Sequence, residues 1–73
     1  MKPPLLSGNE VIRAFLRAGF LKTGQRGSHV KLYLPSKQIT LIIPNHREVD
    51  RWTLRGIIRD SGLTIEEFIR LTK

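Results

Sequence analysis

The first pattern of apolar residues along the chain has helical spacing. Ser7–Glu10 fits a capping box, in which the serine hydroxyl and the glutamate carboxylate each accept a hydrogen bond from the other residue's backbone amide. The apolar residues that follow share one helix face: Val11, Ile12, Phe15 and Leu16. Gly19 favours a left-handed helix end, and Phe20 can fold back onto Phe15 as an apolar clasp. We therefore expect a first helix that begins at this box and ends before Gly19.

Three short strands are expected next, separated by turns that contain glycine, serine and proline. The expected strands are Phe20–Gln25, His29–Leu34 and Gln38–Ile43. Apolar and polar residues alternate in the second strand, which gives it two different faces: Val30, Leu32 and Leu34 against His29, Lys31 and Tyr33. Because the connections are too short for crossovers, we expect an antiparallel meander with its apolar face toward the core.

The second half of the chain predicts two more helices. The first is expected over Arg51–Ser61, with Asp50 as its N-cap and Gly62 at its end. Its residues that face the sheet are apolar: Leu54, Ile57 and Ile58. Thr64–Glu67 fits a second capping box, which predicts a short C-terminal helical tail. The order α-β-β-β-α with this tail predicts an α+β fold, in which helices cover one face of a three-stranded antiparallel sheet.

Length and composition limit the class of protein. The 73 residues are expected to form a single domain, residues 1–73, with a flexible N-terminus over residues 1–6. The absence of cysteine excludes disulfides, thiolate chemistry and cysteine-based zinc sites. Two histidines and six scattered carboxylates make a poor set of metal ligands, so neither a metal nor another cofactor is expected. No apolar run approaches the roughly 20 residues that span a bilayer, and Met1–Gly8 is too short and too rich in proline for a secretory signal. These observations predict a cytoplasmic protein without a membrane partner.

The charge of the chain indicates a polyanionic partner. Thirteen Lys and Arg residues against six Asp and Glu residues give a net charge of +7. Such a field attracts nucleic acid through long-range steering and phosphate neutralisation. In the second expected helix, Arg51, Arg55 and Arg59 lie four residues apart in one line, called the basic ridge below. Like charges in a line repel one another, so the ridge favours phosphate contacts over an ordinary solvated helix face.

The tripeptide Gly27-Ser28-His29 stands where the polar face of the second expected strand begins. A histidine titrates near neutral pH, and two small residues before it leave room for the backbone of a substrate. His29, Lys31 and Tyr33 then place an imidazole, an ammonium and a phenol in a row. This strand face therefore also suits a polyanion.

At four places, in matching order and spacing, the sequence resembles the HicA (YcfA-like) toxins. The four blocks are Gly19-Phe20, Gly27-Ser28-His29, Pro44-x-His46 and Trp52-Thr53-Leu54-Arg55-x-Ile57-Ile58. The resemblance runs from about Ser7 to Phe68 and implies a fold like that of the double-stranded-RNA-binding domain. It also implies a type II toxin that cleaves mRNA without a metal and is inhibited by a cognate HicB antitoxin. The essential histidine of the family corresponds to His29, whereas Trp52 replaces the family's usual glycine.

Cleavage of RNA without a metal needs a base that takes the 2′-hydroxyl proton and an acid that protonates the leaving 5′-oxygen. An imidazole can serve in either role, so His29 is the expected catalytic residue rather than an ordinary solvated histidine. Arg26 and Lys31 are nearest in sequence to stabilise the charge that develops at phosphorus. The residues expected to contact RNA are Gly27, Ser28, Lys31, Arg26, His46, Arg51, Arg55 and Arg59.

Several assignments have alternatives at this level. His46 is either a second catalyst or, as we favour, a substrate contact or structural residue. Trp52 either stacks on a base or belongs to the core. Ser28 is not expected to act as a nucleophile, because no third residue orients His29 toward it and neighbouring strand residues point to opposite faces. For the protein as a whole, the alternatives to a toxin are a non-catalytic RNA-binding module with the same basic surface and an adaptor that binds an acidic protein.

Overall fold

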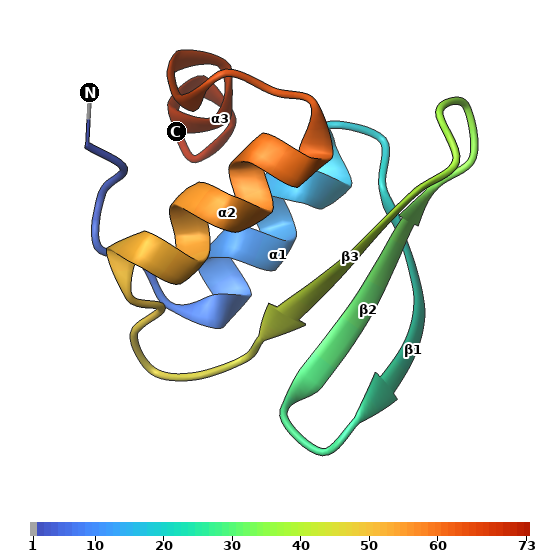
Figure 1. Ribbon diagram of the computed structural model, residues 1–73. Coiled ribbons are helices and arrows are strands. Elements are labelled where there is room, and N and C mark those ends of the chain that lie inside the picture. The colour runs from blue at the N-terminus through green and yellow to red at the C-terminus, as the bar shows by residue number, and fades with distance from the viewer. Residues whose placement is uncertain (1) are drawn as a thin grey trace.

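The computed structural model describes residues 2–73 of the chain. Its elements are α1 (Gly8–Arg17), β1 (Leu21–Arg26), β2 (His29–Leu34), β3 (Ile39–Pro44), α2 (Arg51–Ser61) and α3 (Ile65–Leu71). Figure 1 shows α1 and α2 on one face of the sheet, and α3 packs against both helices. This arrangement confirms the expected α+β fold and its order of elements. Of the helices within these residues, none combines the length and hydrophobicity that spanning a bilayer requires.

The sheet is an antiparallel meander in the order β1-β2-β3, as expected. β2 has the expected bounds, but β1 and β3 each begin and end one residue later than predicted. β3 includes Pro44, which pairs with His29. A proline is tolerated at the end of an edge strand, where its missing N–H need not serve a neighbouring strand. In β1, a bulge between Lys22 and Gly24 shifts the register, so that Gly24 lies opposite Lys31.

The core lies between the sheet and the helices. Phe15 of α1 is central to it, because the centre of its ring is 5.4 Å from that of Phe20 and 5.1 Å from that of Phe68 in α3. The predicted apolar faces of β2 and α2 supply further buried side chains: Val30, Leu32, Leu54, Ile57 and Ile58. The expected clasp of Phe20 on Phe15 is therefore confirmed, and α3 completes the core through Phe68.

One residue of the predicted stripe on the first helix points elsewhere. Leu16 is 42% exposed, whereas Ala14 is buried. Successive residues turn by about 100° around a helix, so a buried face that contains Val11 and Phe15 also takes in Ala14 but directs Leu16 outward. The prediction that Leu16 belongs to the buried face of the first helix was therefore wrong.

The helix ends follow the signals in the sequence. Ser7 and Thr64 each head a complete capping box, so both predicted boxes are confirmed. Asp50 is the N-cap of α2, and its carboxylate accepts hydrogen bonds from two amides of the first turn. Gly62 ends α2 with a φ of 83°, in the left-handed region that favours glycine. Local side-chain chemistry thus fixes where these helices start and where α2 stops.

The start of the chain, expected to be flexible, makes two hydrogen bonds to the region around the beginning of α2. The amide of Val49 donates to the carbonyl of Leu6 at 2.7 Å, which forms an isolated antiparallel bridge. Nε of Arg51 donates to the carbonyl of Pro3 at 3.1 Å. The described part of this segment therefore lies along the start of α2, and Met1 lies outside the described residues.

Candidate active site

The turn between β1 and β2 positions His29. Gly27 has a φ of 58°, which the two-residue hairpin turn of Gly27 and Ser28 requires. Nε2 of Gln25 donates to the carbonyl of Gly27 at 3.1 Å and braces this turn. Apart from the chain neighbours of Gly27, no atom lies within 4 Å of the position that a Cβ would take there. His29 therefore begins β2 at an open, accessible corner of the sheet.

Beside His29, the sheet carries a hollow of about 300 Å³, called the sheet hollow below. Its lining residues come from all three strands: Gly24, Gln25, Arg26, His29, Lys31 and Ile42. The strand register explains this set, because Arg26 lies opposite His29, while Gly24 and Ile42 flank Lys31 on the two neighbouring strands. The structure thus brings together the histidine and the two cations that the sequence analysis expected to act on the RNA phosphate.

The sheet hollow is basic and open to solvent. Arg26, His29 and Lys31 are all exposed, and no acidic side chain is among the residues that line the hollow. Within residues 2–73, no three His, Asp or Glu side chains form a group that could hold a metal ion. A phosphate in the hollow would therefore meet two cations and a solvent-exposed imidazole.

Three residues of the sheet hollow were missed by sequence reasoning: Gly24, Gln25 and Ile42. A Cβ at Gly24 would meet no atom within 4 Å, so this glycine leaves space next to Lys31 rather than avoiding a clash. Ile42 is 49% exposed and supplies an apolar wall. Strand alternation signals that Ile42 points away from the core, because Leu41 and Ile43 on either side of it are buried. Its place opposite Lys31 follows only from the register of the strands.

His46 lies at the same end of the sheet as His29 but does not line the sheet hollow. Its Nε2 is 3.5 Å from Oγ of Ser28, and the amide of Asn45 donates to the carbonyl of Ser28 at 2.7 Å. The loop after β3 is therefore attached to the turn that precedes His29. His46 thus contacts the turn next to His29, and its role as a substrate contact or a structural residue stays a prediction.

Gly8 is another residue whose importance the sequence did not reveal. Its amide donates to the carbonyl of His46 at 2.8 Å. A Cβ at Gly8 would overlap the backbone of Asn45 and Pro44. Only glycine therefore lets the start of α1 approach the loop that follows β3. In the sequence, Gly8 is merely the second residue of a capping box, and nothing there signals a close approach.

The basic ridge is formed, but on a different face from the sheet hollow. Arg51, Arg55 and Arg59 are all exposed on α2. The buried side of α2 packs against the inner face of the sheet, on which Figure 1 shows this helix. His29 and Lys31 are exposed and alternate along β2 with the buried Val30 and Leu32, so they belong to the outer face. The expected RNA contacts therefore fall into two groups, one around the sheet hollow and one along α2.

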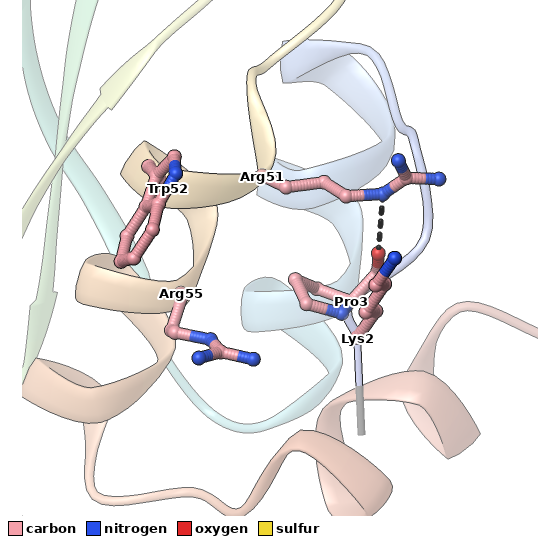
Figure 2. A pocket seen from close by; sticks show the side chains of 5 residues that line it. All are labelled: Lys2, Pro3, Arg51, Trp52 and Arg55. Atoms are coloured by element: carbon pink, nitrogen blue, oxygen red, sulfur yellow. Dashed lines mark hydrogen bonds between the residues drawn. The ribbon is translucent and has the colours of Figure 1, made fainter.

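The structure settles the position of Trp52, which is 82% exposed and therefore outside the core. The guanidinium carbon of Arg55 lies 6.0 Å from the centre of its ring. Figure 2 shows the hollow at the start of α2 that these two side chains share with three others, called the helix hollow below. It measures about 280 Å³, and its lining residues are Lys2, Pro3, Arg51, Trp52 and Arg55.

The part of the chain that forms the sheet hollow matches the model of one protein family. A family model described as "HicA toxin of bacterial toxin-antitoxin" matches residues 8–63. A search of the curated proteins gives no match. The matched range takes in α1, the whole sheet and α2, and it contains every residue that lines the sheet hollow. Because the match covers most of the chain, as the four sequence blocks predicted, the chain belongs to the HicA toxin family and is the toxin of a toxin–antitoxin system.

Proposed function

We propose that this HicA family toxin is an endoribonuclease that cleaves mRNA at the sheet hollow without a metal, with His29 as its catalytic residue. The observation that supports this proposal most is the meeting of His29, Arg26 and Lys31 in one open hollow. An imidazole can transfer the protons of such a reaction, and cations next to it can stabilise the charge that develops at the phosphate. A solvated surface histidine would not require this surrounding.

The proposed reaction is a transesterification within the RNA. His29 takes the proton of the 2′-hydroxyl, O2′ attacks the adjacent phosphorus, and the bond from phosphorus to O5′ breaks. The products are a 2′,3′-cyclic phosphate and a 5′-hydroxyl end, whose proton comes from solvent in the open hollow. Arg26 and Lys31 stabilise the negative charge that grows on the phosphoryl oxygens.

The remaining expected contacts have supporting roles in this proposal. Gly27 and Ser28 form the open turn along which the RNA backbone approaches His29. His46 keeps this turn in place through Ser28. The basic ridge binds phosphates further along the RNA, where the charge of its arginines acts without regard to base sequence.

We also propose that a cognate HicB-like antitoxin inhibits the toxin in the cytoplasm by covering the sheet hollow. The hollow is shallow, basic and open, so an acidic partner can be steered to it and can occlude it directly. Amide exchange with and without the antitoxin tests this: protection is expected over residues 27–33 and around His46. Protection confined to residues from Thr64 onward would instead mean inhibition at a distance.

Cleavage of RNA by the purified toxin in the presence of a chelator tests the proposed activity. The wild type is expected to cleave RNA and to arrest growth when expressed. His29→Ala is expected to cleave roughly 10²–10⁴ times more slowly and to be tolerated by cells. Because His29 is exposed, the variant should show the same thermal unfolding as the wild type.

Two results would overturn the proposed activity. Equal cleavage rates for His29→Ala and the wild type would assign the chemistry to another residue. Salt-sensitive RNA binding by the wild type without any cleavage would identify the chain as a non-catalytic RNA-binding module with the same basic surface.

A further inference from the structure

Trp52 is exposed to an extent that the packing of α2 does not explain. It is the only tryptophan of the chain, and 82% of it is accessible. The core side of α2 is already filled by Leu54, Ile57 and Ile58. The amide of Trp52 donates to Asp50 at 2.8 Å, so the helix start is complete without the indole ring. The fold therefore does not need the indole ring for its packing.

The surroundings of Trp52 are cationic and ordered by contacts within the chain. Lys2, Arg51 and Arg55 line the helix hollow, and no carboxylate does. Nε of Arg51 donates to the carbonyl of Pro3, which holds Pro3 against the start of α2. Figure 2 shows the indole of Trp52 on one side of the hollow and Pro3 with Lys2 on the other. Flat apolar surfaces and positive charges thus meet in one small space.

The size of the helix hollow limits what it can hold. Its volume of about 280 Å³ lies just below the range of roughly 300–1,000 Å³ that is typical of pockets for drug-sized ligands. A single planar base fits such a space better than an extended peptide does. Aromatic side chains next to arginines are the usual means by which proteins bind unpaired bases and the adjacent phosphates.

A protein partner fits the helix hollow less well. The fully buried centres of protein–protein interfaces are more apolar than the rest of the surface and poor in lysine, although tryptophan and arginine are enriched there. Three of the five lining residues here are cations, and none of the other exposed large apolar side chains lines this hollow: Leu5, Leu16, Leu21 and Ile42. An isolated indole among cations therefore favours a nucleotide.

We propose that the helix hollow binds one unpaired nucleotide of the RNA, with its base stacked on Trp52 and its phosphate next to Arg51, Arg55 and Lys2. This inference rests on the proposed function in one respect, namely that RNA is the partner of the toxin. Only a base outside a duplex can offer its face to the indole, so the site selects single-stranded RNA. The hollow thereby adds a recognition site to the toxin on a face that His29 does not share.

The unique tryptophan provides the readout for a test. The probe is a short single-stranded 2′-O-methyl oligonucleotide, which carries no 2′-hydroxyl proton and therefore cannot be cleaved. A matched probe has abasic sites and so keeps the phosphates without the bases. We expect the first probe to quench the fluorescence of Trp52 and to bind more tightly than the abasic probe, by roughly 5- to 150-fold.

Variants separate stacking from charge. Because both tryptophan variants lack the fluorescent residue, their binding is measured by the fluorescence anisotropy of a dye attached to each probe. Trp52→Ala should bind both probes with equal affinity, whereas Trp52→Phe should retain part of the preference for bases. Lys37→Ala is the control, because it removes one positive charge in the turn between β2 and β3, far from the start of α2 (Figure 1). It should leave the ratio of the two affinities unchanged.

Three results would overturn the inference. One is equal binding of the two probes by the wild type, and another is an undiminished preference for bases in Trp52→Ala. The third is a fluorescence change that appears with the antitoxin but with neither probe, which would assign the helix hollow to a protein contact. Cleavage of ordinary RNA by the same preparation is scored separately. Base-dependent quenching without cleavage would refute the nuclease activity alone, and cleavage without base-dependent quenching would refute the nucleotide site alone.

Discussion

The sheet hollow and the helix hollow of this toxin are similar in size, at about 300 and about 280 Å³, and both are lined by cations without a carboxylate. They differ in the side chain that lies among those cations. In the sheet hollow it is His29, an imidazole that can transfer a proton. In the helix hollow it is Trp52, an indole that can only stack. The first hollow therefore suits chemistry on a phosphate, and the second suits the holding of a base.

This difference shows how little positive charge alone says about function. Lys and Arg side chains supply phosphate affinity wherever they lie, and that affinity does not depend on base sequence. The net charge of +7 is shared between both faces of the molecule. What separates the faces is the aromatic ring in each hollow, an imidazole in one and an indole in the other, together with the backbone that positions it.

The largest effect is expected when the substrate loses the group that only the sheet hollow uses. An RNA with a single 2′-deoxy residue on the 5′ side of the cleaved bond should not be cut there, because O2′ is the attacking atom in the proposed reaction. Quenching of Trp52 by the same RNA should be unaffected. Analysis of the products on a sequencing gel measures the first outcome. Cleavage at the deoxy position would mean that water attacks the phosphate directly and that the transesterification is wrong.

The cations of the sheet hollow and those of the basic ridge should act on different kinetic parameters. Lys31→Ala should lower the cleavage rate at saturating toxin by roughly 10- to 100-fold, since it removes charge stabilisation at the reacting phosphate. Charge reversal at Arg55 and Arg59 should act mainly on affinity. It should weaken the binding of RNAs of unrelated sequence about equally and flatten the salt dependence of binding. Single-turnover rates over a range of toxin and salt concentrations distinguish the two. If only the charge reversals on α2 lowered the rate at saturation, the roles assigned to the two groups of cations would be reversed.

A matched pair of glycines tests the scaffold behind each hollow. Gly8→Ala should lower the free energy of unfolding by about 1–3 kcal/mol, because the new Cβ overlaps the backbone of Asn45 and Pro44. It should also slow cleavage by displacing the loop that braces the turn before His29. Gly56→Ala in α2 should instead raise the free energy of unfolding by about 0.5–1 kcal/mol, since its Cβ would meet only the end of the Arg59 side chain, at 3.7 Å. Denaturant melts measure both, and equal stability of the two variants would argue against the close approach at Gly8.

The smallest expected effect is the acid sensitivity of the helix caps. Hydrogen bonds from the Thr53 hydroxyl, and then from the amides of Trp52 and Thr53, hold the pKa of Asp50 below its usual value of 3.8. In the capping boxes, bonds from the N-cap amide and then the N-cap hydroxyl hold the pKa of Glu10 and of Glu67 below 4.5. These carboxylates have a lower pKa in the folded state than in the unfolded state. They therefore stabilise the fold above the unfolded values, and this contribution is lost as the pH falls through the folded ones.

The melting temperature should accordingly decline below about pH 4.5 and stay level above it. Asp50→Asn keeps an N-cap but cannot ionise, so its decline should be shallower than that of the wild type. If the melting temperatures of wild type and variant declined in parallel, Asp50 would not contribute to the acid sensitivity. Neither hollow contains any of these carboxylates, so the loss of stability is separate from any pH dependence of cleavage.

Local signals in the sequence predicted most of the fold. Capping boxes at Ser7 and Thr64, the N-cap Asp50 and the stop at Gly62 depend on side chains within a few residues, so the pattern alone locates them. Strict alternation likewise located β2 correctly. The shifts of β1 and β3 and the outward turn of Leu16 depend instead on how elements pack, which local patterns do not contain.

The site was predictable in part for the same reason. His29, Arg26 and Lys31 come from one hairpin, so their sequence proximity becomes spatial proximity. Gly24 and Ile42 join them only through the bulge and the strand register. The division between the sheet hollow and the basic ridge is a property of the layers, because it depends on which face of the sheet α2 covers.

The most direct test of the central claim compares His29→Ala and Trp52→Ala in single-turnover cleavage of the same single-stranded RNA. At saturating toxin, His29→Ala is predicted to be slower than the wild type by roughly 10²–10⁴-fold, with little change in the concentration that gives half the maximal rate. Trp52→Ala is predicted to need a higher concentration for its half-maximal rate, by roughly 5- to 150-fold, while its rate at saturation falls far less than that of His29→Ala. If His29→Ala reached the wild-type rate at saturation, the sheet hollow would not be the site of cleavage.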